Sequence, residues 1–348
     1  MMRVEPENDH ADMEFGIYTL ADLRSDPHTG ISISARQRLN EIIQAAKIAD
    51  EAGLDVFGVG EHHRLDYAVS SPQIVLSSIS QITKRIKLTS ATTIFNTVDP
   101  VRLFEDFATL DLLSNGRAEI MAGRGAFTES FSLFGYNLEN CDDLFEENIH
   151  LFRKLCAHDR VSWTGRFRSE FLDAEISPRP IQQRIPLWIG VQESLESAAR
   201  AGRFGTGLAL VLFEGDPIRF KPLVDRYRQS AYEAGHEPAG LKVGVTGHVY
   251  IAETTQKARD EFYPYHVNYW ENDISRADFE QLSGEESALF VGSSQQIIEK
   301  ILRQYELFGH QRFMAQMDMG GMPFRKVVEN IERLATEIVP VVRKAIQK

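Results

Sequence analysis

The chain has 348 residues, of which 43% are hydrophobic and 25% charged, and its formal net charge is −12. This composition is typical of a globular protein with a sizeable core, and it excludes a disordered chain. The acidic balance, without a stripe of Lys and Arg, disfavours nucleic acid as a partner. No apolar run approaches the roughly 18 residues that span a bilayer, and no apolar signal segment opens the chain. We therefore expect a soluble, cytoplasmic protein without a membrane partner.

Buried strands alternate with amphipathic helices along the sequence. After a polar tail at residues 1–12, Ser32 or Ser34 is suited to cap a first helix, Pro72 opens a second, and Asp99 with Pro100 opens a third. Apolar patterns predict eight strands, at residues 13–18, 55–60, 86–95, 117–122, 187–191, 207–212, 242–252 and 313–319. Eight strands that alternate with helices predict an α/β fold, a single (β/α)8 TIM barrel over residues 13–348.

Two long gaps between the predicted strands indicate insertions, after the fourth strand (about 124–185) and after the seventh (about 253–292). The second gap is rich in aromatic residues, including Tyr269 and Trp270. It is interpreted either as a lid over the site or as a surface excursion with a small core of its own. Cys141 and Cys156 lack any CxxC or Cys/His pattern, so we expect both to be reduced thiols.

Polar residues and glycines follow several predicted strands at the carboxyl end, where a barrel of this kind places its active site. These are 61–63 (EHH), 91–93 (ATT), 123–125 (GRG), 192–194 (QES) and 318–321 (DMGG). His62 and His63 are neighbours on a strand and point to opposite faces, and no further ligand pattern accompanies them, so we expect no metal site. Either histidine could instead be structural, or act as an acid, a base or a proton relay.

Two of these segments are suited to bind an anion. Arg124 stands between two glycines, which let a ligand approach the backbone, although a surface ion pair is the alternative. The segment from Gln192 and Glu193 to Ser194 and Ser197 opens a helix directly after a strand, and here the alternative is an ordinary helix cap. The GxGxxG and GxxxxGK[ST] patterns are absent, which disfavours dinucleotide and P-loop binding.

Four stretches of the chain resemble the bacterial luciferase-like flavin-dependent monooxygenases. They are EHHRLDYAVSSPQIVLSSIS, DPVRLFEDFATLDLLSNGR within the longer run from Ile86 to Gly135, PLWIGVQESLESAARAG, and the closing RFMAQMDMGGMPFRKVVENIERLATEIVPVVR. The resemblance covers nearly the whole chain from Met13 onward. It implies a barrel enzyme that uses reduced FMN, supplied by a separate flavin reductase, and that forms a homodimer through the helices at 72–84 and 100–113.

The resemblance also assigns roles to residues. His62 corresponds to the catalytic histidine of the family and Arg124 to its FMN-phosphate arginine; Gln192, Glu193, Ser194 and Ser197 belong to its phosphate loop. Ala91 and Thr92 fall where these enzymes have a non-prolyl cis peptide under the flavin ring. Apolar walls around the flavin are expected from Ile94, Phe95, Phe127, Met317 and Met319. The pair Ala126–Phe127 and the second insertion depart from bacterial luciferase, so light emission is not implied.

The expected function is oxidation of a small, apolar organic substrate with reduced FMN and O2. Three alternatives stay open: a non-catalytic flavin-binding protein, a deazaflavin-dependent dehydrogenase on the same barrel, and a metal-assisted hydrolase, which the missing ligand set disfavours. The sequence does not identify the organic substrate.

Overall fold

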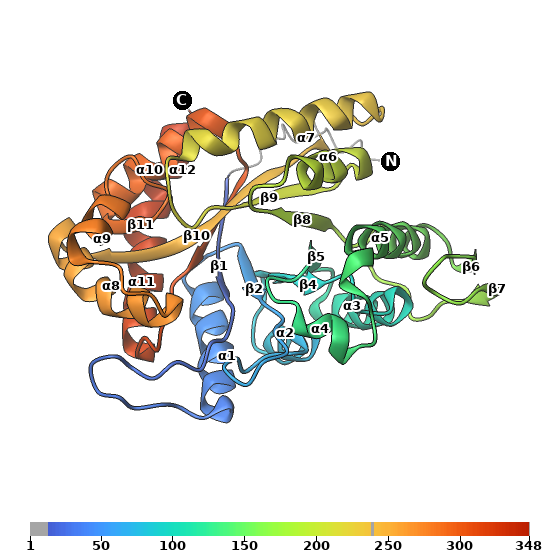
Figure 1. Cartoon of the computed structure of the whole chain (residues 1–348), viewed down its shortest axis with the longest axis horizontal. Coiled ribbons are helices and arrows are strands. Elements are labelled where there is room, and N and C mark those ends of the chain that lie inside the picture. Colours follow the sequence, from blue (N-terminus) through green and yellow to red (C-terminus); the bar gives the residue numbers. More distant parts are fainter. Residues whose placement is uncertain (1–12, 238–239, 348) are drawn as a thin grey trace, which may run out of the picture.

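The computed structural model describes residues 13–237 and 240–347, so the predicted tail at residues 1–12 lies outside the described residues. Eight parallel strands close into the predicted barrel, and the helices pack around it (Figure 1). The barrel strands are β1 (Glu14–Thr19), β2 (Val56–Val59), β3 (Lys87–Ser90), β5 (Ala118–Gly123), β8 (Leu187–Val191), β9 (Gly207–Val211), β10 (Val243–Ala252) and β12 (Arg312–Gln316). Each strand overlaps one of the eight predicted segments, and pairing of β1 with both β2 and β12 closes the ring.

The helices that surround the barrel begin where their caps predict. Ser34 accepts a hydrogen bond from the Gln37 N–H, and Asp99 accepts from the first turn of its helix, which Pro100 opens. These helices are α1 (Ala35–Glu51), α2 (Pro72–Ser80), α3 (Pro100–Ser114), α5 (Cys141–Ala157), α6 (Leu195–Phe204), α7 (Lys221–Glu233, preceded by the short η2, Pro217–Phe220), α10 (Ser294–Phe308) and α11 (Phe324–Arg333). The last continues through a π-helical turn, η4 (Leu334–Ile338), into α12 (Val339–Ile346).

The predicted strand at residues 86–95 is interrupted. β3 ends at Ser90 and a two-residue strand, β4 (Thr93–Ile94), follows it, because the Ala91–Thr92 peptide bond between them is cis, as the resemblance implies. Both short strands pair with β5. The interruption directs residues 91–94 toward the mouth of the barrel.

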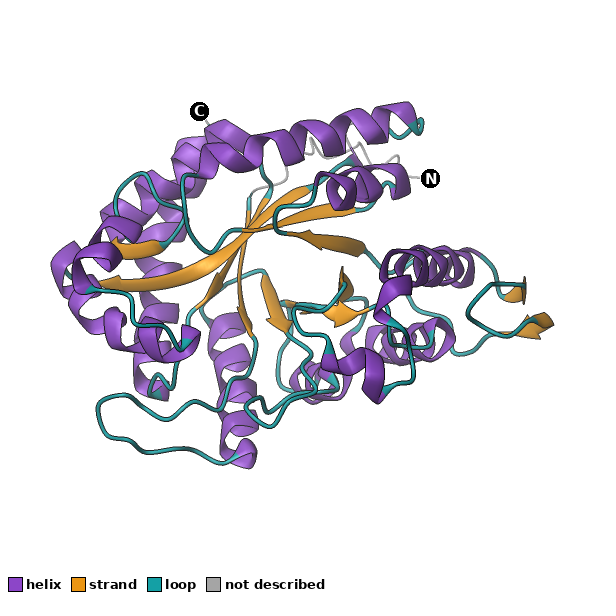
Figure 2. Cartoon of the chain, in the orientation of Figure 1, coloured by secondary structure: helices purple, strands orange, loops and turns teal. Residues whose placement is uncertain are grey.

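The two insertions have secondary structure that the sequence patterns did not predict. The first contains α4 (Glu129–Leu133), the short η1 (Leu138–Asn140) and a hairpin of β6 (Arg160–Trp163) and β7 (Phe171–Glu175), which lies at the right-hand edge of Figure 2. The second contains α8 (Thr255–Trp270), α9 (Arg276–Leu282) and β11 (Phe290–Ser293), which pairs with the far end of β10. These two excursions lie on opposite sides of the barrel (Figure 1).

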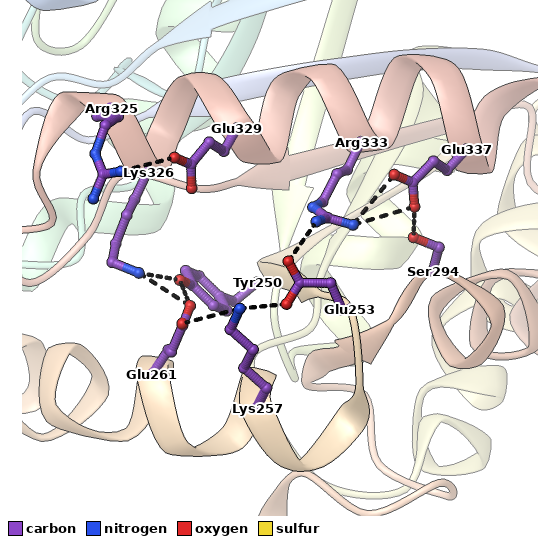
Figure 3. A network of polar contacts seen from close by, with 10 residues as sticks. All are labelled: Tyr250, Glu253, Lys257, Glu261, Ser294, Arg325, Lys326, Glu329, Arg333 and Glu337. Carbon is purple, nitrogen blue, oxygen red and sulfur yellow. Dashed lines mark hydrogen bonds and ion pairs between the residues drawn. The ribbon is translucent and has the colours of Figure 1, made fainter.

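Charged side chains fasten α8 to α11 (Figure 3). Glu261 of α8 accepts hydrogen bonds from the Tyr250 hydroxyl (2.6 Å) and from Lys326 Nζ (3.0 Å). Just before α8, Glu253 pairs with Lys257 of α8 and with Arg333 of α11, and Arg333 also contacts Glu337 of η4. We call the contacts of Glu253 and Glu261 with α11 the clasp. The clasp holds α8, whose last two residues are Tyr269 and Trp270.

Apolar side chains form one core inside the barrel and a larger one between the strands and the helices. The inner core contains Tyr18, Val56, Ala91, Met121, Trp188, Ala209 and Met314. At its amino-terminal end, Arg312 lies 4.2 Å from the Trp188 ring centre and pairs with Glu14 and Glu119, which closes the bottom of the barrel. Met317 and Met319 belong to the outer core, so the expectation that they wall the flavin site is wrong; strand β12 ends at Gln316, before both.

Candidate active site

A cavity of about 230 Å³ lies at the carboxyl-terminal mouth of the barrel. Five of the eight predicted site residues line it: His62, Ala91, Thr92, Arg124 and Gln192. The other three, Glu193, Ser194 and Ser197, lie beyond Gln192 at the start of α6 and are not part of the lining. A larger hollow of about 640 Å³ lies beside the β6–β7 hairpin, but loop and helix residues such as Asp99 and Arg168 line it rather than strand ends.

The cis peptide forms one wall of the mouth cavity. Thr92 is closely surrounded: a Cβ on Gly123 would lie 2.2 Å from Thr92 Oγ1, so only glycine fits at the end of β5. Just after the cis bond, the Ile94 N–H donates to Glu61 Oε2 (3.1 Å), while Glu61 Oε1 is 2.9 Å from His63 Nε2. Glu61 thereby links the end of β2 to the segment that follows the cis bond.

His62 is held between aromatic rings at the edge of the cavity. Its imidazole stacks on Tyr67 with ring centres 4.0 Å apart, and the ring of Phe127 meets it edge-on at 5.7 Å. Only 9% of the residue is exposed, and Nδ1 is buried without a hydrogen-bond partner among the described residues. Burial lowers the pKa of His62 to about 4, against the smaller opposing effect of Asp66, so the ring is neutral at pH 7.

Arg124 reaches from the end of β5 toward α5. Its Nη1 lies 3.1 Å from Asp142 Oδ1, and the same oxygen accepts a hydrogen bond from Arg200 Nη2 at 2.9 Å. Burial alone would raise the pKa of Asp142, but the hydrogen bond and charge of Arg200 outweigh it and the pKa falls. Asp142 therefore keeps a cationic partner even when Arg124 turns toward another anion.

The start of α6 provides a second polar surface near the cavity. Ser194 is the N-cap and accepts from the Ser197 N–H at 3.1 Å, as the alternative interpretation of this segment predicted. The Ser197 hydroxyl, however, is buried and lacks a hydrogen-bond partner among the described residues. Such a group is costly unless a ligand or water satisfies it. Gln192 and Glu193 are exposed on the loop before the helix.

Several lining residues were not predicted as part of the site. Tyr18 of β1, Phe213 after β9 and Thr246 of β10 all face the cavity. Glu61, which follows β2, also lines it; the sequence placed it at the rim of the barrel but gave it no role. Tyr18 stands at the end of a predicted strand and could have been proposed on that ground. Phe213 and Thr246 carry no distinguishing local pattern. Among the described residues, no group of three or more His, Cys, Asp or Glu side chains is arranged to hold a metal ion, and no helix is long and apolar enough to cross a membrane.

Comparison with known families places this geometry in context. The family described as luciferase-like monooxygenase matches residues 13–312, which span the barrel from β1 to the start of β12. The chain belongs to this family. It is therefore an oxidoreductase of the luciferase-like monooxygenase family built on a (β/α)8 barrel, and the resemblance stated from the sequence is confirmed.

Individual relatives differ in the reactions for which they are named. The oxygenase component of flavin-dependent trigonelline monooxygenase from Acinetobacter baylyi is 24% identical, over 94% of this chain and 95% of that protein. The solved structure of monooxygenase RslO1 from Streptomyces bottropensis is 25% identical, with a TM-score of 0.83, over 94% and 99% of the two chains. An F420-dependent glucose-6-phosphate dehydrogenase from Amycolatopsis mediterranei is 28% identical over 56% of this chain and 60% of that protein. The family thus includes flavin-dependent and F420-dependent enzymes.

Proposed function

We propose that this protein is a monooxygenase that uses reduced FMN and O2 to oxidise a small, mainly apolar organic substrate. The observation that carries the proposal is the mouth cavity, in which His62, the Ala91–Thr92 bond and Arg124 come together from three different strand ends. Catalytic groups of barrel enzymes characteristically come from several strand ends at this face. The similarity to a flavin-dependent oxygenase component over nearly the whole of both chains supports the same conclusion.

The residues at the cavity fit a phosphorylated flavin. Arg124, the backbone N–H groups at the start of α6 and the Ser197 hydroxyl would hold the phosphate, because the positive end of a helix dipole favours an anion and Ser197 Oγ has no other partner. Ala91 and Thr92 would support the flavin ring, with Gln192 and Glu193 at the edge of the phosphate loop. When the phosphate binds, Arg124 would move from Asp142 to the phosphate, and Asp142 would keep its hydrogen bond from Arg200.

Reduced FMN, when bound, supplies the electrons with which O2 is activated. His62 is neutral at pH 7, so its imidazole has one N–H donor and one acceptor nitrogen with which it would relay a proton, and the Tyr67 ring holds the imidazole plane in place. Met121, Ile94 and Met314 line the cavity with apolar surface, which limits the access of water to the reacting atoms. Phe127 adds an aromatic cover beside His62.

A separate flavin reductase would deliver the reduced cofactor. The relative named above is the oxygenase component of its system, a name that implies a second, reducing component. We propose a transient encounter between the two proteins, since the mouth of the barrel must open to receive each reduced flavin. The protein itself would act as a homodimer in the cytoplasm.

The second candidate is an F420-dependent dehydrogenase on the same barrel, which the Amycolatopsis relative supports. Anaerobic titration with reduced FMN and with reduced F420, followed by oxygen and product analysis, separates the two. We expect reduced FMN to bind and an oxygenated product to appear after O2 is admitted. Binding of F420 alone, with oxidation of an alcohol and no use of O2, would establish the dehydrogenase; tight FMN binding without any product would leave a flavin-binding protein.

A further inference from the structure

Three adjacent barrel strands carry a row of buried polar side chains just beyond the cavity. In the parallel register, His248 of β10 pairs with Gln316 of β12, and Gln316 pairs with Tyr18 of β1. Thr246 and Met314, two residues earlier on β10 and β12, line the cavity. Because side chains two apart on a strand share a face, His248 and Gln316 also point into the barrel, one step nearer its mouth. We call Tyr18, Gln316 and His248 the polar row.

None of the three side chains makes a hydrogen bond of normal geometry among the described residues. Both ring nitrogens of His248 and both amide atoms of Gln316 are unpaired, as is the Tyr18 hydroxyl. They nevertheless lie close to other polar groups, because weak side-chain hydrogen bonds from Gln316 affect the pKa values of His248 and Tyr269, and one from Thr246 affects the pKa of Tyr18. His248 and Gln316 are completely buried, and buried polar atoms without partners are rare and costly. Three such groups in one row at the mouth of a barrel indicate a place where a ligand supplies the missing partners.

Aromatic rings cover the polar row. The ring centre of Phe213 lies 4.5 Å from the ring centre of His248. The ring centres of Tyr269 and Trp270, both on α8, each lie 5.7 Å from the same imidazole. Phe213 also lines the cavity, so its ring separates the cavity from His248, whereas Tyr18 lines the cavity directly. We call Phe213, Tyr269 and Trp270 the aromatic wall. The clasp holds the first half of α8 against α11 (Figure 3), and Tyr269 and Trp270 are the last two residues of the same helix.

The polar row has no charge at neutral pH. Burial, with a smaller contribution from His266, lowers the pKa of His248 to about 3, and burial raises the pKa of Tyr18 above its usual range. Asp318, which adds to the rise for Tyr18, is itself paired with Arg38 at 2.9 Å. A neutral imidazole, an amide and a phenol together offer both donors and acceptors, but no counterion for a carboxylate or an ammonium group.

We propose that the aromatic wall and the polar row form the substrate site, and that the substrate is a flat, uncharged ring compound bearing hydroxyl or carbonyl oxygens. The ring would lie against Phe213 and Trp270, and its oxygens would bond to Gln316, His248 and Tyr18. That the bound ring compound is a substrate rests on the proposed function. The Phe213 ring must turn aside for such a ligand to reach His248.

The same protein provides an internal control. Gln304 of α10 and His310, which precedes β12, are also buried with unpaired amide and imidazole atoms. Like His248 and Gln316, they do not line the mouth cavity themselves, but they also lie away from it: Gln304 is on a helix, and His310 precedes the amino-terminal end of β12, whereas His248 and Gln316 are two residues from the lining residues Thr246 and Met314. Missing hydrogen bonds alone therefore do not define a ligand site in this molecule; the position at the barrel mouth and the aromatic wall distinguish the polar row.

The test is calorimetric titration of the full chain carrying Arg124→Ala, so that no guanidinium lines the cavity, without added flavin and with 2-naphthol, 2-naphthoate and naphthalene. We expect 2-naphthol to bind about tenfold more tightly than either of the others, since the polar row can satisfy its hydroxyl but cannot neutralise a carboxylate. Gln316→Leu and His248→Phe should each weaken 2-naphthol binding about fivefold to tenfold, the range for a lost neutral hydrogen bond. Gln304→Leu and His310→Phe should leave it unchanged.

Absence of 2-naphthol binding up to its solubility, equal binding of 2-naphthoate, or equal losses in the two pairs of variants would each overturn the proposal. Because no flavin is present, these outcomes do not depend on the assignment of FMN. Failure of the anaerobic FMN titration, conversely, would leave the ring-binding site in place and overturn only the proposed cofactor.

Discussion

Arg124 has two possible anionic partners, Asp142 in the structure and the proposed FMN phosphate. We predict that Arg124→Ala weakens binding of reduced FMN by about 1.5–3 kcal/mol, the range for a hydrogen bond to a charged group. Ser194→Ala should cost less, because the backbone N–H groups of α6 remain. Anaerobic equilibrium titration at moderate salt measures both effects.

Arg166→Ala is the matched control for this prediction. Arg166 is 65% exposed and pairs with Asp143, the neighbour of Asp142 on α5, but it does not line the cavity. Its loss should leave flavin affinity unchanged. An Arg124→Ala protein that binds reduced FMN as tightly as the parent would remove Arg124 from the phosphate site.

His62 is assigned a role in proton transfer rather than in binding. We predict that His62→Ala leaves FMN affinity nearly intact but lowers turnover by roughly 10²- to 10⁴-fold, the usual contribution of a general acid or base. The ring is already neutral at pH 7 because burial lowers the pKa of His62 to about 4. Steady-state kinetics on the true substrate, beside a flavin titration, separates the two quantities; parental turnover in the variant would exclude the role.

At the level of secondary structure, a partly buried lysine, Lys326, makes one of the two ion pairs of the α8–α11 clasp. Lys326 Nζ lies 3.0 Å from both Glu261 and the Tyr250 hydroxyl, and its side chain is 20% exposed. We predict that Lys326→Ala lowers the free energy of unfolding by about 1–2 kcal/mol, less than a fully buried charged hydrogen bond, since water screens part of it. Cleavage within α8 by thermolysin should become faster.

The next residue along α11 supplies the control. Arg325 pairs with Glu329 at 3.4 Å, but its side chain is 82% exposed. Arg325→Ala should change the free energy of unfolding by less than about 0.5 kcal/mol, as for most surface ion pairs. Equal effects of the two substitutions in urea unfolding would show that the clasp does not hold α8.

The strands could be predicted because their apolar patterns are local. The position of each barrel strand, and the caps at Ser34 and Asp99, follow from a few consecutive residues. The β6–β7 hairpin could not be predicted in the same way, because only one residue of β6 and none of β7 is buried. β11 does have an apolar pattern with three buried residues, but it was overlooked within the second insertion. Met317 and Met319 were placed in the site because the last strand was predicted to extend beyond Gln316.

The candidate site was predicted only where its residues follow strand ends or match the family. His62, Arg124 and the Ala91–Thr92 bond meet both conditions, and the structure brings them to one cavity. In the polar row only Tyr18 ends a predicted strand, and the row as a whole exists only through the register of β10, β12 and β1. Register between strands separated by nearly the whole chain is not contained in any local pattern.

The whole molecule presents an apolar face on two neighbouring helices. On α2, Ile74 is 66% exposed, and on α3, Leu113 is 51% exposed. Also on α2, Ser78 is exposed and Ser77 is half-buried, whereas Ser80 is buried within the protomer and is not part of this face. We predict a homodimer through this face, measured by light scattering at micromolar concentration.

Ile74→Glu should convert the dimer to a monomer, because it places charge in a self-complementary contact. The control is Leu172→Glu: Leu172 of β7 is 79% exposed but lies on the hairpin of the first insertion. Only the first substitution should change the molecular mass in solution. A monomeric parent protein would refute the interface.

Buried histidines make the whole fold sensitive to acid. Burial is the main cause that lowers the pKa of four imidazoles, to about 4 for His62 and His266 and about 3 for His248 and His310. Between pH 6.5 and about 4 the unfolded chain binds protons that the folded chain does not. The contribution of these histidines to the free energy of unfolding is therefore fully present above pH 6.5 and is lost as the pH falls toward 4. Each histidine contributes about 1.4 kcal/mol per pH unit.

Asp22 opposes this trend, since burial raises its pKa to about 6 and the folded chain takes up a proton as the pH falls below that value. Burial also raises the pKa values of Asp55 and Asp106, and these three groups against four do not reverse the sign. Urea unfolding at pH 7.5, 6.0 and 5.0 should show decreasing stability. His310→Phe should flatten the slope by about 1.4 kcal/mol per pH unit, and an unchanged slope would contradict the assignment.

The pairing of β1 with β12 joins residues about as far apart in sequence as this chain allows; the Glu14–Arg312 pair spans 298 positions. Among the barrel strands, β1 leaves the ribosome first and its partner β12 last. Until then its largely buried apolar strand has an open edge, which is a template for pairing with other chains. Substitutions that slow ring closure should therefore reduce the yield of active enzyme in the cell while leaving the turnover of each folded molecule unchanged.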